Sequence, residues 1–485
     1  MNRYGRALMG LHAWGGMVFG CLLVPIFIAG SLAVFEPEIS HWMRPELSAL
    51  AFSQARAIAL GDARLRELGA EAAVWRLRLP TAREPTLGIG WGKNPRTMTE
   101  QVLDAATGEP LIPRRTEGGH FFTDLHAELL LGALGRWLVG AAGIFMLAAL
   151  LSGVLIHHRI LQDFFTLRPR AGARRAWLDA HNLIAVATLP FLLMIAHTGV
   201  VILAETFMPA ATRALYDSRP GYPRADVVRA FDRPASGEPS VPRPLTEAFA
   251  QAEAVLGEGK VSNLLVRRPW DRAGVVHAYR HVDDRLAAVA DHVAFDAVSG
   301  ERIGLQQDWN GAAYAYRAQV GLHVAHFGGP AIRGVYFVSG LLGAATMAAG
   351  IVLFLRKLRQ KHGDSGGQRV LEALGVASVC GPLLGCAAYL WANRLLASPL
   401  DGREVIEMSA FFALWALALP HAWLRGAAAW RDQLVLAAVL ALGLPLLDLA
   451  GDVPADALRV GVNSVACALG VVLLITGLRL FGRTR

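Results

Sequence analysis

The sequence predicts a mainly α-helical membrane protein with about eight transmembrane helices, and three observations support this fold class. Of the 485 residues, 54% are hydrophobic and only 18% are charged, and the mean hydropathy is +0.38. Eight stretches are apolar over the roughly 20 residues that a membrane-spanning helix needs. The first four of these stretches also belong to an internal repeat. The predicted spans are about 13–35, 137–157, 182–204, 334–355, 371–393, 405–424, 433–449 and 458–480.

The internal repeat consists of two tandem copies of a helix–insert–helix unit. In the first half of the unit, equivalent residues are 169 positions apart, as His12 and His181 are. In the second half the offset is 197 positions, as for His126 and His323. A repeat of this kind determines the architecture. We therefore expect a first repeat over 1–160, a second repeat over 175–360 and a C-terminal four-helix membrane region over 370–485.

Two segments between paired helices leave the membrane, at about 40–124 and 206–322. Each contains a helical stretch, then strand-like runs, then a turn of the form Asp-x-x-[ST]-Gly, at Asp104–Gly108 and Asp296–Gly300. A strand followed by such a turn and a further short strand is typical of a hairpin. We expect each insert to be a small α+β domain. The predicted helices are 47–68 and 245–256, and the predicted strands are 74–79, 100–104, 261–267 and 292–296.

Positive charge predicts the orientation of the spans, because Lys and Arg accumulate in cytoplasmic loops. Arginine and lysine clusters precede the first span, separate the second from the third, follow the fourth and the sixth, and end the chain. All of them fall on one side if both termini are cytoplasmic. The net charge of +8 is then a consequence of membrane topology, and we expect no nucleic-acid partner. The first apolar run has no small-residue cleavage site and is predicted to be a retained anchor.

Histidines at membrane depth are the candidate functional residues, since an ionisable side chain there is costly and marks a functional site by default. His12, His157 and His181 lie at the cytoplasmic ends of the first three spans, at similar depth. Haem iron takes axial imidazoles from facing helices. Two of these three histidines are therefore expected to hold a haem b, which would be non-covalent because the chain has no CxxCH pattern. Alternatively, they lie among lipid headgroups at the membrane boundary.

A second haem is expected near the outer face. His126 and His323 are equivalent in the repeat and are its candidate ligands. Arg136 and Arg333 are also equivalent, and a guanidinium group suits the carboxylates of haem propionates. Alternatively, these arginines mark the outer membrane boundary. His197 follows His181 by 16 residues, or ~24 Å along one helix, and either ligates the second haem or hydrogen-bonds Thr198 or a neighbouring helix.

The chain resembles a known family. The helix–insert–helix unit with its two Asp-x-x-[ST]-Gly-Glu turns, together with 152–157 and 177–182, is similar to the PepSY domain with its associated transmembrane helices. The resemblance covers about 1–360. It implies a bacterial inner-membrane protein with both inserts in the periplasm, of the type that reduces ferric siderophores through haem. The chain departs from the expected pattern at Leu192, where a family histidine is expected, and at His197, where an aromatic residue is expected.

The leading functional hypothesis is an oxidoreductase that carries electrons across the bilayer to a ferric siderophore or another ferric chelate. We find no convincing GxGxxG, GxxxxGK[ST], HExxH or GxSxG motif. The electron donor is therefore expected to be a membrane quinol, a soluble partner or a separate reductase. One alternative is a non-redox PepSY membrane protein that regulates a protease or a signalling partner. A siderophore permease is the other alternative, although the two repeats are parallel rather than inverted.

Overall fold

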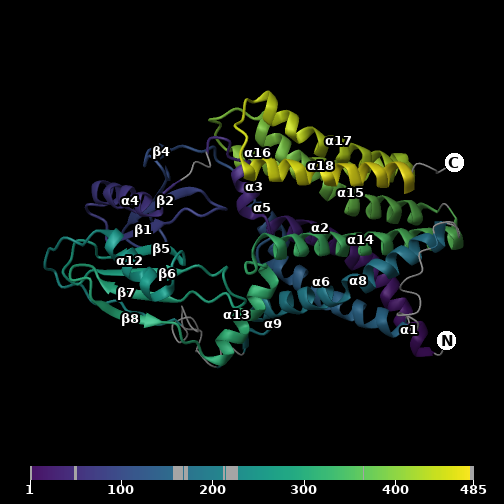
Figure 1. Cartoon of the computed structure of the whole chain (residues 1–485). Coiled ribbons are helices and arrows are strands. Elements are labelled where there is room, and N and C mark those ends of the chain that lie inside the picture. Colours follow the sequence, from purple (N-terminus) through teal and green to yellow (C-terminus); the bar gives the residue numbers. More distant parts are fainter. Residues whose placement is uncertain are drawn as a thin grey trace. The chain divides into compact units, whose positions relative to one another are not determined.

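Eight helices in the described part of the chain are long and apolar enough to cross a membrane, one for each predicted span. The computed structural model describes residues 3–47, 52–156, 168, 173–210, 214, 228–363 and 365–480. The predicted membrane fold class is thus confirmed. The first span comprises α1 (Arg3–Gly10), η1 (Leu11–Gly15) and α2 (Gly16–Ala33). The others are α6 (Ala133–Ile156), α8 (Ala173–Ile202), α14 (Gly329–His362), α15 (Gly366–Leu395), α16 (Arg403–Arg425), α17 (Ala428–Ala450) and α18 (Ala457–Leu480) (Figure 1).

The chain divides into two compact units. The first unit comprises Met1–Met43, Arg115–Phe207 and Pro330–Arg485 and contains the membrane helices. The second unit comprises Arg44–Arg114 and Met208–Gly329 and contains the two inserts. The first unit also includes three short helices, α3 (Glu36–Trp42), α5 (His120–Glu128) and α9 (Ala204–Phe207).

Within the first unit, the last four helices pack directly on the helices of the repeats. One apolar cluster joins Val24 of α2 and Ile351 of α14 to Val376 of α15 and Leu434 of α17. A second cluster joins Trp42 of α3 and Phe121 of α5 to Tyr389 and Phe411 on α15 and α16. The C-terminal region is therefore part of the same core as the repeats.

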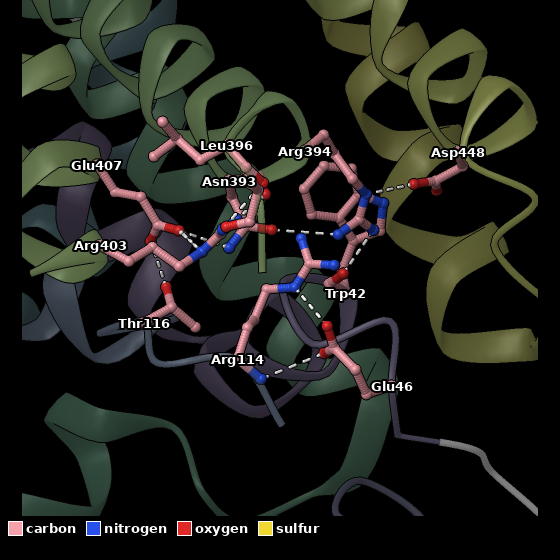
Figure 2. A network of polar contacts seen from close by, with 11 residues as sticks. Trp42, Glu46, Arg114, Thr116, Asn393, Arg394, Leu396, Arg403, Glu407 and Asp448 are labelled. Carbon is pink, nitrogen blue, oxygen red and sulfur yellow. Dashed lines mark hydrogen bonds and ion pairs between the residues drawn. The ribbon is translucent and has the colours of Figure 1, made fainter. Parts of the chain in front are cut away.

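A buried polar network reinforces this packing (Figure 2). Glu407 of α16 and Arg403, one turn before it, are 0% and 1% exposed, and they form an ion pair at 2.9 Å. The Glu407 carboxylate also accepts hydrogen bonds from Asn393 of α15, at 2.9 Å, and from the hydroxyl of Thr116. Arg403 donates as well to the carbonyl of Leu396 at 2.9 Å. Both charges are thus compensated on several sides.

The same network continues to α17 and α18. Arg394 of α15 forms an ion pair with Asp448 at 2.6 Å, and its guanidinium carbon lies 3.8 Å from the centre of the Trp42 ring. The indole N–H of Trp42 donates to Asn463 at 2.9 Å, and Asn463 donates to Asp448 at 2.8 Å (Figure 2 shows the Arg394 part). Trp42 of α3 therefore contacts residues of α15 and α18 directly, and both of these residues bond to Asp448 of α17.

The second unit contains one antiparallel sheet to which both inserts contribute. Its strand order is β4-β3-β2-β1-β5-β6-β7-β8. The strands are β1 (Val74–Arg78), β2 (Thr86–Gly92), β3 (Thr99–Asp104), β4 (Pro110–Leu111), β5 (Val261–Arg267), β6 (Val275–Arg280), β7 (His292–Asp296) and β8 (Arg302–Gln306), and the helices are α4 (Gln54–Leu68), α12 (Leu245–Leu256) and α13 (Gly311–Val324) (Figure 1). The predicted helix and strands of each insert are present.

The two inserts join through β1 and β5, a junction that the sequence does not reveal. Trp75 pairs with Val266, and Leu77 with Leu264. Each insert alone would leave the first of its strands as a sheet edge with unpaired backbone groups. Pairing these two edges gives one sheet instead of two separate domains. Its core includes Ile58 of α4 and Phe249 of α12.

The two predicted Asp-Gly turns have the same geometry. The Asp104 carboxylate accepts from the backbone N–H of Ala106 and Thr107, both at 2.9 Å. The Asp296 carboxylate accepts from Val298 and Ser299, at 2.8 and 2.7 Å. Gly108 and Gly300 both have a φ of 78°, in the left-handed region where a side chain would be strained.

Asp296 gives the second unit a predictable dependence on pH. Burial raises the pKa of Asp296, but hydrogen bonds from Ser299, Arg233 and Val298 and the charge of Arg233 outweigh it, so the net pKa lies below its ordinary value. A carboxyl group of this kind stabilises the fold above its unfolded-state pKa of about 4, and this contribution is lost as the pH falls through the folded-state pKa. We expect the thermal unfolding midpoint of the full chain to fall less steeply below pH 4 in Asp296→Asn than in the unmodified protein. Asp308→Asn, whose side chain is 70% exposed, is the control, and equal slopes in both variants would contradict the prediction.

The Arg403–Glu407 pair predicts a large loss of stability when one partner is removed. Arg403→Met leaves the carboxylate buried and uncompensated, which costs about 3–5 kcal/mol of unfolding free energy. The double variant Arg403→Met with Glu407→Leu is expected to recover most of this loss, because no buried charge remains. Arg425→Met, from an ion pair whose arginine is 51% exposed, is the matched control at about 0–1 kcal/mol. Unfolding of the purified protein in mixed micelles measures all four proteins, and equal losses in Arg403→Met and Arg425→Met would refute the prediction.

Candidate metal centre

His12 lies in η1, a π-helical turn in the first span. Such turns occur mostly as single insertions in α-helices, often at functional sites. The Nδ1 atom of His12 is 3.1 Å from the carbonyl oxygen of Ala149 and 3.3 Å from the hydroxyl of Ser152, both on α6. Because a carbonyl oxygen only accepts, Nδ1 carries the hydrogen toward Ala149, and in the neutral ring Nε2 keeps its lone pair. The ring is thus fixed in the tautomer that metal ligation through Nε2 requires.

His181, the repeat equivalent of His12, is fixed in the same way. It lies on α8, and its Nδ1–H donates to the carbonyl oxygen of Thr346 on α14 at 2.8 Å. Thr346 is offset by 197 positions from Ala149, so the two acceptors are themselves equivalent in the repeat. The two copies of the unit therefore build the same histidine–carbonyl contact.

A glycine one turn after each carbonyl makes room for the imidazole. A Cβ atom at Gly153 would lie 3.3 Å from Cε1 of His12, and one at Gly350 would lie 3.4 Å from Cε1 of His181. Each glycine follows the accepting residue by four positions. Since a Cβ atom in a helix is tilted toward the N-terminus, a side chain at this position would cover the carbonyl. Glycine leaves the carbonyl open to a second donor.

The rings of His12 and His181 meet between the two repeats. Their centroids are 6.5 Å apart and their planes are inclined by 83°. Two imidazoles on opposite sides of one metal ion, with metal–nitrogen distances of about 2 Å, have centroids about 6 Å apart. The arrangement is thus compatible with one ion between the two rings. His157, the third histidine predicted at this level, lies outside the described residues.

His126 of α5 shows the same pattern at the other end of the first span. Its Nδ1–H donates to the carbonyl oxygen of Ile26 at 2.9 Å. A Cβ atom at Gly30, again four residues later, would lie 2.6 Å from this Nδ1. Burial lowers the pKa of His126, which favours a neutral ring. Ile26 follows His12 by 14 residues, so the two histidine contacts are ~21 Å apart along the helix.

The remaining predicted site residues are placed less specifically. His323 lies half-buried on α13 in the second unit, and His197 is an exposed residue of α8. Arg136 is 54% exposed and pairs with Glu128 at 2.7 Å. Arg333 is buried in α14 at 7% exposure. Within the part of the chain that the structure describes, no group of three or more His, Cys, Asp or Glu is arranged to hold a metal ion.

Sequence reasoning did not identify the partners of these histidines. Ala149, Ser152 and Thr346 contribute backbone carbonyls or a hydroxyl and carry no motif. The sequence does contain one signal. Gly153 and Gly350 are equivalent in the repeat, at the 197-residue offset, and a glycine at both positions of a membrane helix indicates that another group approaches the backbone closely.

Comparison with known proteins identifies the family of the N-terminal three-quarters of the chain. Residues 9–357 match the family model of the PepSY-associated TM region. Over 322 residues, the chain is 29% identical to the uncharacterized protein PA4219 of Pseudomonas aeruginosa, an alignment that covers 62% of this chain and 80% of that protein. The family match includes both copies of the helix–insert–helix unit and all three histidine–carbonyl contacts. The chain belongs to the family of membrane proteins with a PepSY-associated transmembrane region.

Proposed function

We propose that this protein is an inner-membrane haem b oxidoreductase that carries electrons through the bilayer and reduces ferric iron in the periplasm. The substrate is a ferric siderophore or another ferric chelate. The observation that supports the proposal best is the His12–His181 pair, two imidazoles from different repeats whose ring centroids are 6.5 Å apart and whose planes are inclined by 83°. Both rings are fixed by carbonyl acceptors on neighbouring helices.

The residues present fit a haem. Two imidazoles from the protein would suffice to hold a haem, whereas a structural zinc ion would need four protein ligands. The Nδ1–H bonds to Ala149 and Thr346 are second-shell contacts that orient a ligating imidazole and raise its basicity. In this proposal His12 and His181 hold one haem through their Nε2 atoms.

A second haem is assigned to the outer end of the repeats. His126 has the same carbonyl contact as His12 and His181 and is the proposed ligand of this haem in the membrane unit. Arg136 and Arg333 would pair with the propionates of a bound haem. Arg136 is able to leave Glu128, because an exposed ion pair contributes at most about 1 kcal/mol. When bound, two haems at the two ends of the first span would supply a path for single electrons.

The arginine clusters support an orientation with both termini in the cytoplasm and both inserts in the periplasm. The second unit then faces the ferric chelate. Arg267 and Arg280, two of its cationic residues, are paired with Asp232 at 2.9 Å and with Asp284 at 2.5 Å. These two residues are therefore held by carboxylates of the protein. Reduction to Fe(II) weakens binding by hard oxygen donors and releases the metal.

The haem assignment predicts which of the two haems each histidine variant loses. The purified full chain is expected to show low-spin b-type absorbance bands after dithionite reduction, with about two haems per chain. His12→Ala and His181→Ala should each lose the same haem, and His126→Ala should lose the other. His362→Ala, an exposed residue at the end of α14, is the control and should retain both. A colourless protein from haem-replete cells would overturn the proposal.

The glycine next to His126 gives a second, sterically matched test. In Gly30→Ala the new Cβ would overlap Nδ1 of His126, so the ring must move away from the Ile26 carbonyl. We expect this variant to lose the same haem as His126→Ala. Gly16→Ala, on the same helix, has nothing within 4 Å of the new Cβ and should retain full haem content. Equal haem content in both glycine variants would exclude His126 as a ligand.

A further inference from the structure

A cavity of 670 Å³ lies within the first unit, between helices of the repeats and helices of the C-terminal region. Its walls come from α2, α3, α8 and α14 on one side and from α15, α17 and α18 on the other. Ala344, Ala345, Ala348 and Ala349 line it on α14. These small side chains leave the space open where the two groups of helices would otherwise pack.

The cavity extends through most of the apolar thickness of a membrane. On α18 its lining runs from Ala457 to Thr476, or ~28 Å at 1.5 Å per residue, which is close to the ~30 Å of a bilayer hydrocarbon core. Such a length accommodates an extended hydrocarbon chain.

The two ends of the cavity differ in chemistry. Thr476 lies at one end, and its hydroxyl donates to the carbonyl of Val472 on its own helix. Glu38 of α3 lies at the other end and is the one charged residue among the described residues that line the cavity. Phe35, Phe122 and Phe337 also line this end, and the rings of Phe35 and Phe337 are in edge contact at 5.5 Å.

We propose that the cavity binds a membrane quinol, with its isoprenoid tail along α18 and its ring among the phenylalanines beside Glu38. The phenylalanines offer aromatic surface to a flat ring, and the carboxylate accepts a hydrogen bond from a quinol hydroxyl. This inference rests on the proposed function and identifies its electron donor.

The position of Glu38 also assigns the electron and proton routes. Oxidation of one quinol to quinone breaks two O–H bonds and releases two electrons and two protons, which balances the reduction of two ferric ions to ferrous ions. Glu38 accepts the protons one at a time and passes them to water at the outer face. Phe122 lies one turn before His126 on α5, so this end of the cavity adjoins the outer histidine.

Photolabelling tests the binding directly. The full chain in phosphatidylcholine nanodiscs is illuminated with an azido derivative of ubiquinone-2, and the labelled peptides are mapped by mass spectrometry. Label is expected on peptides that contain Phe35 or Phe122. Ala348→Trp fills the cavity and should reduce labelling at least tenfold, whereas Leu342→Trp, an exposed residue of the same helix that does not line the cavity, should not. Glu38→Gln replaces a charged acceptor by a neutral one and is expected to weaken binding about tenfold, because hydrogen bonds to charged groups are the stronger ones.

The outcomes separate this inference from the proposed function. A haem-containing protein that takes no label, or that retains phospholipid in the cavity, overturns the quinol site and leaves the haem proposal standing. A colourless protein that takes the label supports the binding site and overturns its redox role. Anaerobic addition of ubiquinol-2 should reduce haem in the unmodified protein about tenfold faster than in Glu38→Gln. Equal rates in these two proteins would show that the assignment to Glu38 is wrong.

Discussion

The arrangement of the membrane unit depends on one constraint, that a polar N–H in a bilayer must find an acceptor. Three histidines, His12, His126 and His181, meet it in the same way, by donating Nδ1–H to a helix carbonyl that already has its own intrahelical partner. A glycine four residues after each carbonyl leaves that oxygen uncovered. The contact determines the tautomer, the orientation of the ring and the distance between helices at once. A change at any of the three glycines would disturb all of these together.

Polar groups of the C-terminal helices also find buried partners, but through a network instead of single contacts. Trp42 and Thr116 come from the first repeat, and their partners Arg394, Glu407 and Asn463 come from three C-terminal helices. Charges this well buried are tolerated only with complete hydrogen bonding, so the network fixes one register between the two regions. The network holds the helices together at the end where Trp42 lies. Along the helices, small residues such as Ala344 and Ala348 leave the apolar cavity open.

The sequence predicted those features that depend on composition and periodicity. Eight apolar runs indicated eight spans, and the 169-residue offset identified His12 and His181 as equivalent residues, without indicating which two of His12, His157 and His181 meet. Contacts that depend on backbone atoms or on distant pairs were not predictable. The carbonyl of Thr346 carries no sequence signal, and Arg403 and Glu407 resemble boundary charges until Thr116, nearly 300 residues earlier, completes their site. The strand β2 was not predicted, because it is rich in glycine. The pairing of β1 with β5 was not predicted either, because nothing in either insert alone indicates it.

The pairing of β1 with β5 has a consequence for biosynthesis. Roughly 190 residues separate the two strands, and two membrane spans lie between them. At synthesis rates of about 5–20 residues per second, the first insert leaves the membrane roughly 10–40 seconds before its partner strand exists. During that interval β1 is an open template for other chains. Until β5 has been made, the edge of β1 has no partner strand, a condition that a protein with two self-contained inserts would not have.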